Sequence, residues 1–154
     1  LDPPYNRHRY RNNYHVWETL VRWDRPATYG IVRKRDDCRG PASPFNARRG
    51  IHEALSGVIE HLDCPSLVIS FNDEGFLSRT ELEAMLSRRG VVQVLASAHP
   101  RYVGAKIGIH NPRGEKVGTI GRLENVEMLF VATPHGVALE GIPGFELAPA
   151  LLAD

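Results

Sequence analysis

Apolar residues recur at helical spacing in two stretches of the first half of the chain. In residues 12–23, the apolar side chains that fall on one side of a helix are Val16, Trp17, Leu20 and either Val21 or Trp23. A second helix is predicted from Asn46, as its cap, to about Leu62. Its expected buried face consists of Ile51, Leu55, Val58, Ile59 and Leu62. Residues 25–45 show almost no apolar periodicity, so a long irregular loop is expected there.

The second half of the chain alternates strand-like apolar runs with one helical segment. Residues 66–71, 91–95 and 126–132 are short apolar runs of strand type. Between the first two runs, Ser78-Arg79-Thr80-Glu81 has the capping-box pattern of a helix start. Gly90 is expected to end that helix. Asn72-Asp73-Glu74-Gly75, directly after the first run, is either an ordinary turn or part of a site at the strand end.

This order of elements predicts an α/β fold. Helix, strand, helix and strand in succession favour a sheet with crossover helices. Residues 101–121 carry five glycines and alternating apolar residues, which predicts a late β-hairpin. From residue 133 onward the pattern is weak. The expected division is therefore a catalytic-type portion over residues 1–132 and an irregular tail over residues 133–154.

Composition narrows the class of protein. A chain of 154 residues that is 42% hydrophobic and 24% charged can bury a real core. No apolar run approaches the roughly 20 residues that span a bilayer, and no signal-peptide pattern is present. Cys38, Cys64 and the seven histidines show no metal-ligand spacing. These features predict a cytoplasmic protein with neither a membrane nor a metal partner.

Positive charge is concentrated in two zones of a chain whose formal net charge is +1. Residues 1–39 hold nine Lys/Arg against five Asp/Glu, and residues 99–122 hold five against one. Two basic zones are typical of local contact with a polyanion, although ordinary charge clustering on a solvated surface gives the same pattern.

The most specific chemistry stands at the start of the chain, in Asp2-Pro3-Pro4-Tyr5. The prolines have a locked φ and no N–H, so this stiff segment offers carbonyl oxygens and no competing donors. The Asp2 carboxylate and the Pro3 carbonyl can each accept one hydrogen of an exocyclic amine while Tyr5 stacks on its ring. Two such acceptors favour a pyramidal nitrogen whose lone pair points at an electrophilic methyl group. The alternative is a rigid turn without a ligand, because Asp before Pro-Pro is also common loop chemistry.

The motif and the segments after it resemble the D12 or Dam-like family of N6-adenine DNA methyltransferases of bacteria and phages. The resembling segments in chain order are 1–6, which contains the motif, then 13–19, 43–46, 70–75, 101–104 with 111–114, and 127–131. Asp2-Pro3-Pro4-Tyr5 is the segment that is specific for the family. Each of the other segments is weak by itself, and their order along the chain supports the resemblance. The resemblance covers roughly residues 1–132.

The resemblance implies a partial Rossmann-like methyltransferase sheet with flanking helices and a late β-hairpin. It also implies S-adenosylmethionine as the methyl donor and double-stranded DNA from which an adenine is flipped. Asp2, Pro3, Pro4 and Tyr5 are then the catalytic residues, and Asp2 also borders the donor. The residues expected against the DNA, if they are not simply solvated, are Arg7, Arg9, Arg11, Arg101, Tyr102 and Lys106.

One part of that family's pattern is missing from this sequence. The glycine-rich donor loop, of the Phe-x-Gly-x-Gly kind, normally precedes the motif, and no segment here replaces it. The chain starts at Leu1 rather than Met and reaches the motif at once, so we expect the C-terminal catalytic portion of something longer, or one half of a split enzyme with a separate N-terminal half.

The hypothesis is therefore a site-specific adenine DNA methyltransferase of restriction-modification systems, incomplete in this chain. Two alternatives stay open. One is a catalytically incomplete remnant that binds nucleic acid. The other is a methyltransferase acting on another amine: N4 of cytosine, RNA or a protein amide.

Overall fold

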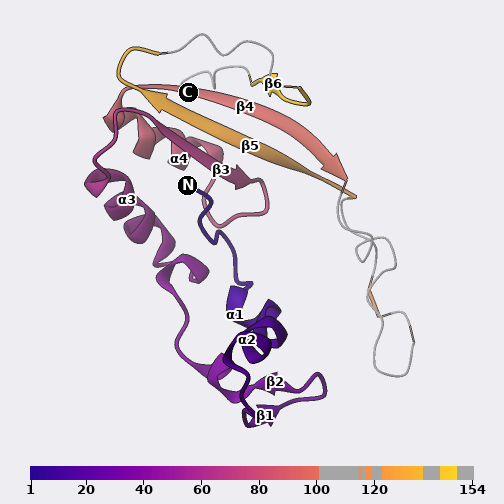
Figure 1. Ribbon diagram of the computed structural model, residues 1–154. Helices are drawn as coiled ribbons and strands as arrows, with labels where there is room; N and C mark the ends of the chain where they lie inside the picture. Colours follow the sequence, from indigo (N-terminus) through magenta and orange to yellow (C-terminus); the bar gives the residue numbers. More distant parts are fainter. Residues whose placement is uncertain (101–114, 116, 119–122, 137–142, 149–154) are drawn as a thin grey trace. The chain divides into compact units, whose positions relative to one another are not determined.

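A computed structural model describes residues 1–100, 115, 117, 118, 123–136 and 143–148. The chain forms two compact units (Figure 1). The sheet unit consists of Leu1–Asp2 and Asp63–Asp154, and the helical unit consists of Pro3–Leu62. The expected late hairpin over residues 101–121 lies almost entirely outside the described residues. In the part of the chain that the structure describes, no helix is long and apolar enough to cross a membrane.

The sheet unit is built on a four-stranded sheet with the order β3-β5-β4-β6 (Figure 1). Its strands are β3 (Leu67–Asn72), β4 (Val91–Pro100), β5 (Glu124–Thr133) and β6 (Glu146–Leu147). Every neighbouring pair is antiparallel, so β3 and β4 run parallel to each other with β5 between them. The three strands predicted from the apolar runs are confirmed, and β4 extends five residues beyond the predicted end at 95.

One helix connects the two parallel strands. Helix α4 (Arg79–Leu86) begins at Ser78, whose side chain accepts from the Glu81 N–H while the Glu81 carboxylate accepts from the Ser78 N–H. A 3-10 turn, η3 (Ser87–Arg89), follows, and Gly90 ends it with φ +138°, a conformation that other residues rarely adopt. The predicted helix and its cap are confirmed, but α4 ends at Leu86, and the glycine expected to end it ends the 3-10 turn instead. The β3-α4-β4 unit is the crossover that the element order predicted.

The core of the sheet unit comes from alternate strand residues and one helix face. Ile69 and Phe71 on β3 and Phe130 on β5 are fully buried, and the same holds for Leu82 and Leu86 on α4. Residues two apart on a strand share one face of the sheet, and residues three or four apart share one face of a helix. Burying a side chain of this size contributes roughly 1.5–3 kcal/mol.

Leu1 lies beside the free edge of β3. Its amino group donates to the Val68 carbonyl at 2.6 Å, and the Ser70 N–H donates to the Leu1 carbonyl at 2.9 Å. One residue bonding to positions on either side of Ile69 is the pattern of a parallel neighbouring strand. Leu1 therefore has the geometry expected of the end of a strand, and Asp2 follows it directly.

The helical unit differs from expectation in its first helix. The predicted helix over 12–23 is divided at Tyr14 into α1 (Tyr10–Asn13) and α2 (His15–Arg22), and Trp23 ends α2 in the left-handed conformation at φ +50°. The apolar side of α2 is exposed within the described structure, where Trp17 is 62% accessible.

The second predicted helix begins later than expected. Helix α3 (Ile51–His61) has Gly50 as its N-cap rather than Asn46, which lies in a separate 3-10 turn, η2 (Pro44–Asn46). The reason is local. Ser43 caps that turn by accepting from the Phe45 N–H, and the Asn46 side chain bonds elsewhere. Of the predicted apolar face, Ile51, Leu55 and Ile59 are buried and Val58 and Leu62 are half-buried.

Residues 25–45, expected to be irregular, contain a small β-hairpin. Strands β1 (Thr28–Tyr29) and β2 (Lys34–Arg35) pair antiparallel, and a 3-10 turn, η1 (Asp36–Arg39), follows. The apolar pattern gives no sign of this hairpin because polar contacts of Arg35 hold it. In the C-terminal tail, β6 pairs with β4 through two residues, which the sequence pattern also did not predict.

Candidate functional site

The Asp2-Pro3-Pro4-Tyr5 motif spans the boundary between the two units. Asp2 is exposed and follows Leu1 at the edge of β3. In the helical unit Pro3 is buried, and Pro4 and Tyr5 are half-buried. Pro4 and Tyr5 line a pocket of about 280 Å³, whose other lining residues are Asn6, His8, Tyr10 and Asn13. Two residues of the motif thus face a cavity with aromatic and amide neighbours, as a base-holding site requires.

Asn46 fixes the backbone directly after the motif. Its side-chain Nδ2 donates to the carbonyl of Asn6 at 2.8 Å and to that of His8 at 3.2 Å. The Asn6 side chain in turn accepts from the His8 N–H at 2.8 Å. These bonds join two segments that the resemblance had picked out separately, residues 1–6 and 43–46. The sequence could suggest the segments but not their contact.

The arginines after the motif contact the loop that follows β2. The Arg9 Nη1 donates to the Gly40 carbonyl at 2.8 Å, and the Arg11 Nη1 donates to the Asp37 carbonyl at 3.0 Å. Arg7 is exposed. Each of these bonds engages one donor of a guanidinium that has five. Arg101, Tyr102 and Lys106, the other residues expected against DNA, lie outside the described residues.

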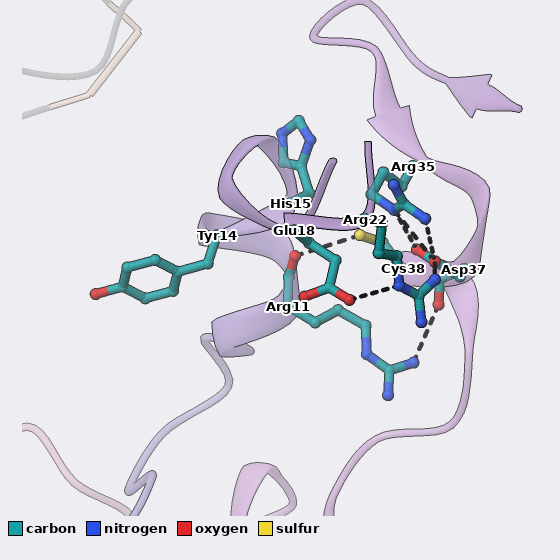
Figure 2. Close-up of a pocket in the computed structure, with 8 residues that line it drawn as sticks. All are labelled: Arg11, Tyr14, His15, Glu18, Arg22, Arg35, Asp37 and Cys38. Atoms are coloured by element: carbon teal, nitrogen blue, oxygen red, sulfur yellow. Dashed lines mark hydrogen bonds and ion pairs between the residues drawn. The ribbon is translucent and has the colours of Figure 1, made fainter. Parts of the chain in front are cut away.

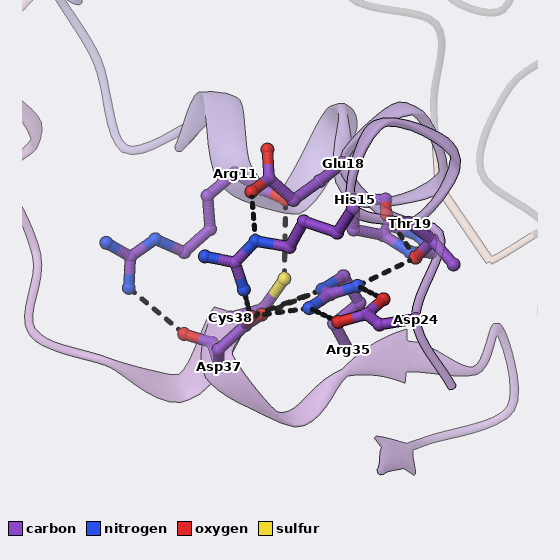
Figure 3. A network of polar contacts seen from close by, with 9 residues as sticks. Arg11, His15, Glu18, Thr19, Asp24, Arg35, Asp37 and Cys38 are labelled. Carbon is purple, nitrogen blue, oxygen red and sulfur yellow. Dashed lines mark hydrogen bonds and ion pairs between the residues drawn. The ribbon is translucent and has the colours of Figure 1, made fainter. Parts of the chain in front are cut away.

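A buried arginine that the sequence did not single out is the centre of the helical unit's polar contacts (Figure 3). The Arg35 side chain is 3% exposed. It donates to both Asp24 carboxylate oxygens at 2.6 and 2.8 Å, to Asp37 at 3.1–3.3 Å, and to the Thr19 hydroxyl at 3.1 Å. The hydrogen bonds from Arg35 hold the pKa of Asp24 and that of Asp37 below their usual values, and they raise the pKa of Arg35.

A second pocket, of about 320 Å³, opens beside this arginine (Figure 2). Two of its three lining arginines are paired with carboxylates: Arg22 lies 2.8 Å from Glu18 and 3.3 Å from Asp37, and Arg35 lies 3.1 Å from Asp37. The Cys38 thiol donates to the Arg11 carbonyl at 3.3 Å. Figure 2 shows Tyr14 turned away from these side chains. Because Arg22 and Thr19 of α2 bond to Asp37 and Arg35, we interpret this cluster as a clamp that fixes the β1–β2 hairpin to α2. Two acidic positions around an arginine-rich loop were the only sequence signal for it.

The Asn72–Gly75 segment is a turn. The Asn72 Oδ1 accepts from the Glu74 N–H, and the Asp73 carboxylate accepts from the Val126 N–H, both at 3.0 Å. The first bond closes the turn, and the second joins the turn after β3 to the start of β5. Of the two readings the sequence left open, the turn is the one these contacts support. Among the described residues no group of His, Cys, Asp or Glu could hold a metal ion.

Comparison with known proteins gives four significant matches. The chain is 31% identical over 91 residues to the type II methyltransferase M.FokI of Planomicrobium okeanokoites. The matched stretch covers 59% of this chain and 14% of M.FokI. It is 28% identical over 105 residues to the modification methylase StsI of Streptococcus sanguinis, a match that covers 66% of this chain and 16% of StsI. It is 26% identical over 106 residues to the modification methylase LlaI of Lactococcus lactis subsp. lactis, a match that covers 66% of this chain and 17% of LlaI.

These homologues are methyltransferases. Their similarity to the chain supports the methyltransferase family. The chain spans less than a fifth of the length of the three relatives just named. No family model matches the chain, and no solved structure matches it.

Proposed function

We propose that this chain carries the catalytic-motif portion of a D12 or Dam-like DNA methyltransferase, which transfers a methyl group to the N6 amine of an adenine flipped out of duplex DNA. The observation that carries the proposal is the placement of Asp2-Pro3-Pro4-Tyr5. The motif follows a residue with parallel-strand geometry, its last two residues line a pocket, and the chain's homologues are methyltransferases.

The motif residues act through positioning and hydrogen-bond acceptance. The Asp2 carboxylate accepts one hydrogen of the adenine amine, and the Pro3 carbonyl accepts the other. The backbone that carries the Pro3 carbonyl is stiff before the base arrives, because Pro3 and Pro4 have a fixed φ. The amine lone pair is thereby drawn out of conjugation with the ring and directed at the methyl group. Tyr5 supplies the face on which the flipped base stacks.

The donor in this proposal is S-adenosylmethionine, which supplies a methyl group activated by a sulfonium. The exposed carboxylate of Asp2 fits a position beside that cation. We propose that a separate or fused N-terminal portion supplies the glycine-rich donor loop. The crossover arrangement of β3, α4 and β4, with Leu1 as a parallel neighbour of β3, supports a partial Rossmann-like sheet.

The test is methyl transfer by the chain combined with the N-terminal portion of a relative, in trans or as a fusion, using tritiated S-adenosylmethionine and duplex DNA. Asp2→Ala is expected to reduce the rate at least 100-fold, which is typical of removing one preorganised hydrogen-bond partner of a transition state. Nucleoside mass spectrometry is expected to show N6-methyladenine.

Two controls sharpen the experiment. Asp63→Ala removes another exposed carboxylate of the same unit and is expected to leave the rate unchanged. Normal turnover by the Asp2→Ala variant would remove the mechanism. If the product is N4-methylcytosine, the substrate is cytosine and not adenine. Donor-independent DNA binding without any methyl transfer would favour the non-catalytic alternative.

A further inference from the structure

The tip of the β1–β2 hairpin exposes two adjacent β-branched apolar side chains. The tip consists of residues 30–33, Gly30-Ile31-Val32-Arg33, and connects the paired residues Tyr29 and Lys34 (Figure 1). Ile31 is 94% exposed and Val32 is 67% exposed. Apolar residues this accessible at a loop tip contribute nothing to the core of the unit.

Positive charge flanks this apolar tip. Arg33 follows Val32, and Lys34 begins the return strand. Within the described residues neither side chain forms an ion pair, whereas Arg22, Arg35, Arg39 and Arg79 each do. An apolar point with cationic flanks is complementary to duplex DNA, where a stacked apolar interior lies between two anionic backbones.

The hairpin is held in place from both sides of its base. Arg35, directly after Lys34, is buried in its contacts with Asp24, Asp37 and Thr19. On the other strand, the Arg39 guanidinium lies 4.3 Å from the centre of the Tyr29 ring. The tip itself is closed by a hydrogen bond from the Arg33 N–H to the Gly30 carbonyl at 3.1 Å, and both residues have positive φ. A braced element can enter a base step without being ordered by the DNA first.

We propose that the hairpin tip is a DNA wedge: Ile31 and Val32 insert at a base step of the duplex while Arg33 and Lys34 contact the flanking phosphates. This inference rests on the proposed function and adds an element that deforms the DNA. Apolar wedges that unstack a step and bend the duplex are a known way of making a base accessible. The Arg35 clamp positions the wedge and does not itself touch the DNA.

The test measures binding of the full chain to a short mixed-sequence duplex that contains 2-aminopurine, whose fluorescence rises when it is unstacked. The double variant Ile31→Ser/Val32→Ser is expected to bind roughly tenfold more weakly and to lose the fluorescence rise. Arg33→Ala is expected to reduce the slope of log affinity against log salt by about 1 and to keep the fluorescence rise. Replacing residues 30–33 by Asn-Gly, which suits a two-residue hairpin loop, removes the tip but keeps its strands.

Val21→Ser is the matched control, because Val21 is a β-branched residue of the same unit and is 84% exposed. It is expected to behave as the wild type. The wedge would be overturned if binding and fluorescence were unchanged in both the Ile31→Ser/Val32→Ser variant and the Asn-Gly replacement of residues 30–33. That result would leave the proposed methyl transfer intact. Equal losses in Val21→Ser would overturn the assignment to the tip. A wild-type chain that binds no duplex at low salt would also overturn the wedge, and the Asp2→Ala transfer assay then decides the proposed function separately.

Discussion

Two hydrogen bonds join the guanidinium of Arg35 to the carboxylate of Asp24, from Nη1 to Oδ1 at 2.6 Å and from Nη2 to Oδ2 at 2.8 Å. Arg35 ends β2, and Asp24 lies just beyond the end of α2. The pair therefore fixes the hairpin to the helix by a planar, bidentate contact. Because Arg35 is almost fully buried, its charge depends on these partners.

Arg35→Ala is expected to lower the thermal midpoint of the helical unit by more than about 5 °C, because it leaves two carboxylates without their shared partner. Arg35→Lys should restore only part of the loss, since an ammonium cannot bond both Asp24 oxygens in a planar fork. Tryptophan fluorescence isolates this unit because both tryptophans of the chain, Trp17 and Trp23, belong to it. Arg25→Ala, the loss of an exposed arginine next to Asp24, is the control, and an equal effect there would contradict the prediction.

The stability of the helical unit is expected to depend on pH through Asp24 and Asp37. Bonding to Arg35 lowers the pKa of both carboxyls in the folded state. The folded state therefore binds these protons less readily than the unfolded state. The stabilisation is complete above the unfolded carboxyl pKa of about 3.9 and is lost as pH falls through the lower folded pKa values.

Denaturant midpoints followed by tryptophan fluorescence should be level at neutral pH and fall below about pH 4. Asp24→Asn should flatten this fall and lower the neutral-pH midpoint, because the amide cannot carry the charge that Arg35 requires. A wild-type midpoint that rises on acidification would refute the linkage.

Asn46→Ala is expected to slow methyl transfer in the reconstituted enzyme by roughly tenfold, because the backbone after the motif loses its two Asn46 bonds, to Asn6 and His8. Asn46 is a positioning residue, so kcat should fall more than the affinity for DNA. Ser43→Ala serves as the control, since Ser43 caps the same 3-10 turn but bonds only locally. Equal falls in kcat for the two variants would show that the turn, and not the amide, matters.

Ser78→Ala is expected to cost about 1 kcal/mol of unfolding free energy in the sheet unit, because alanine lacks the hydroxyl that accepts from the Glu81 N–H. Urea denaturation followed by far-ultraviolet circular dichroism measures the loss. Thr80→Ala changes an exposed residue of the same helix and should stay within about 0.5 kcal/mol of the wild type. If the two variants lose the same stability, the cap does not set the start of α4.

The sheet unit could be read from the sequence where short-range chemistry decides the structure. The β-branched and apolar runs form β3 and β5, each with one face buried. The Ser78 capping box begins α4, and Gly90 ends the 3-10 turn that follows it. The helical unit was read less well. Its apolar stripe around Trp17 suggested one continuous helix, yet Tyr14 interrupts it and the stripe is exposed. Apolar spacing carries no information about a hairpin held by charges.

The candidate site divides in the same way. The identity of the motif residues, and hence their acceptor chemistry, is written in the order Asp2-Pro3-Pro4-Tyr5, because a proline's missing donor and a carboxylate's lone pairs belong to the residues themselves. Contacts between distant segments belong to the folded chain. The pairing of Leu1 with β3, the grip of Asn46 on the motif backbone and the burial of Arg35 each join residues at least eleven positions apart, and no local pattern encodes such a meeting.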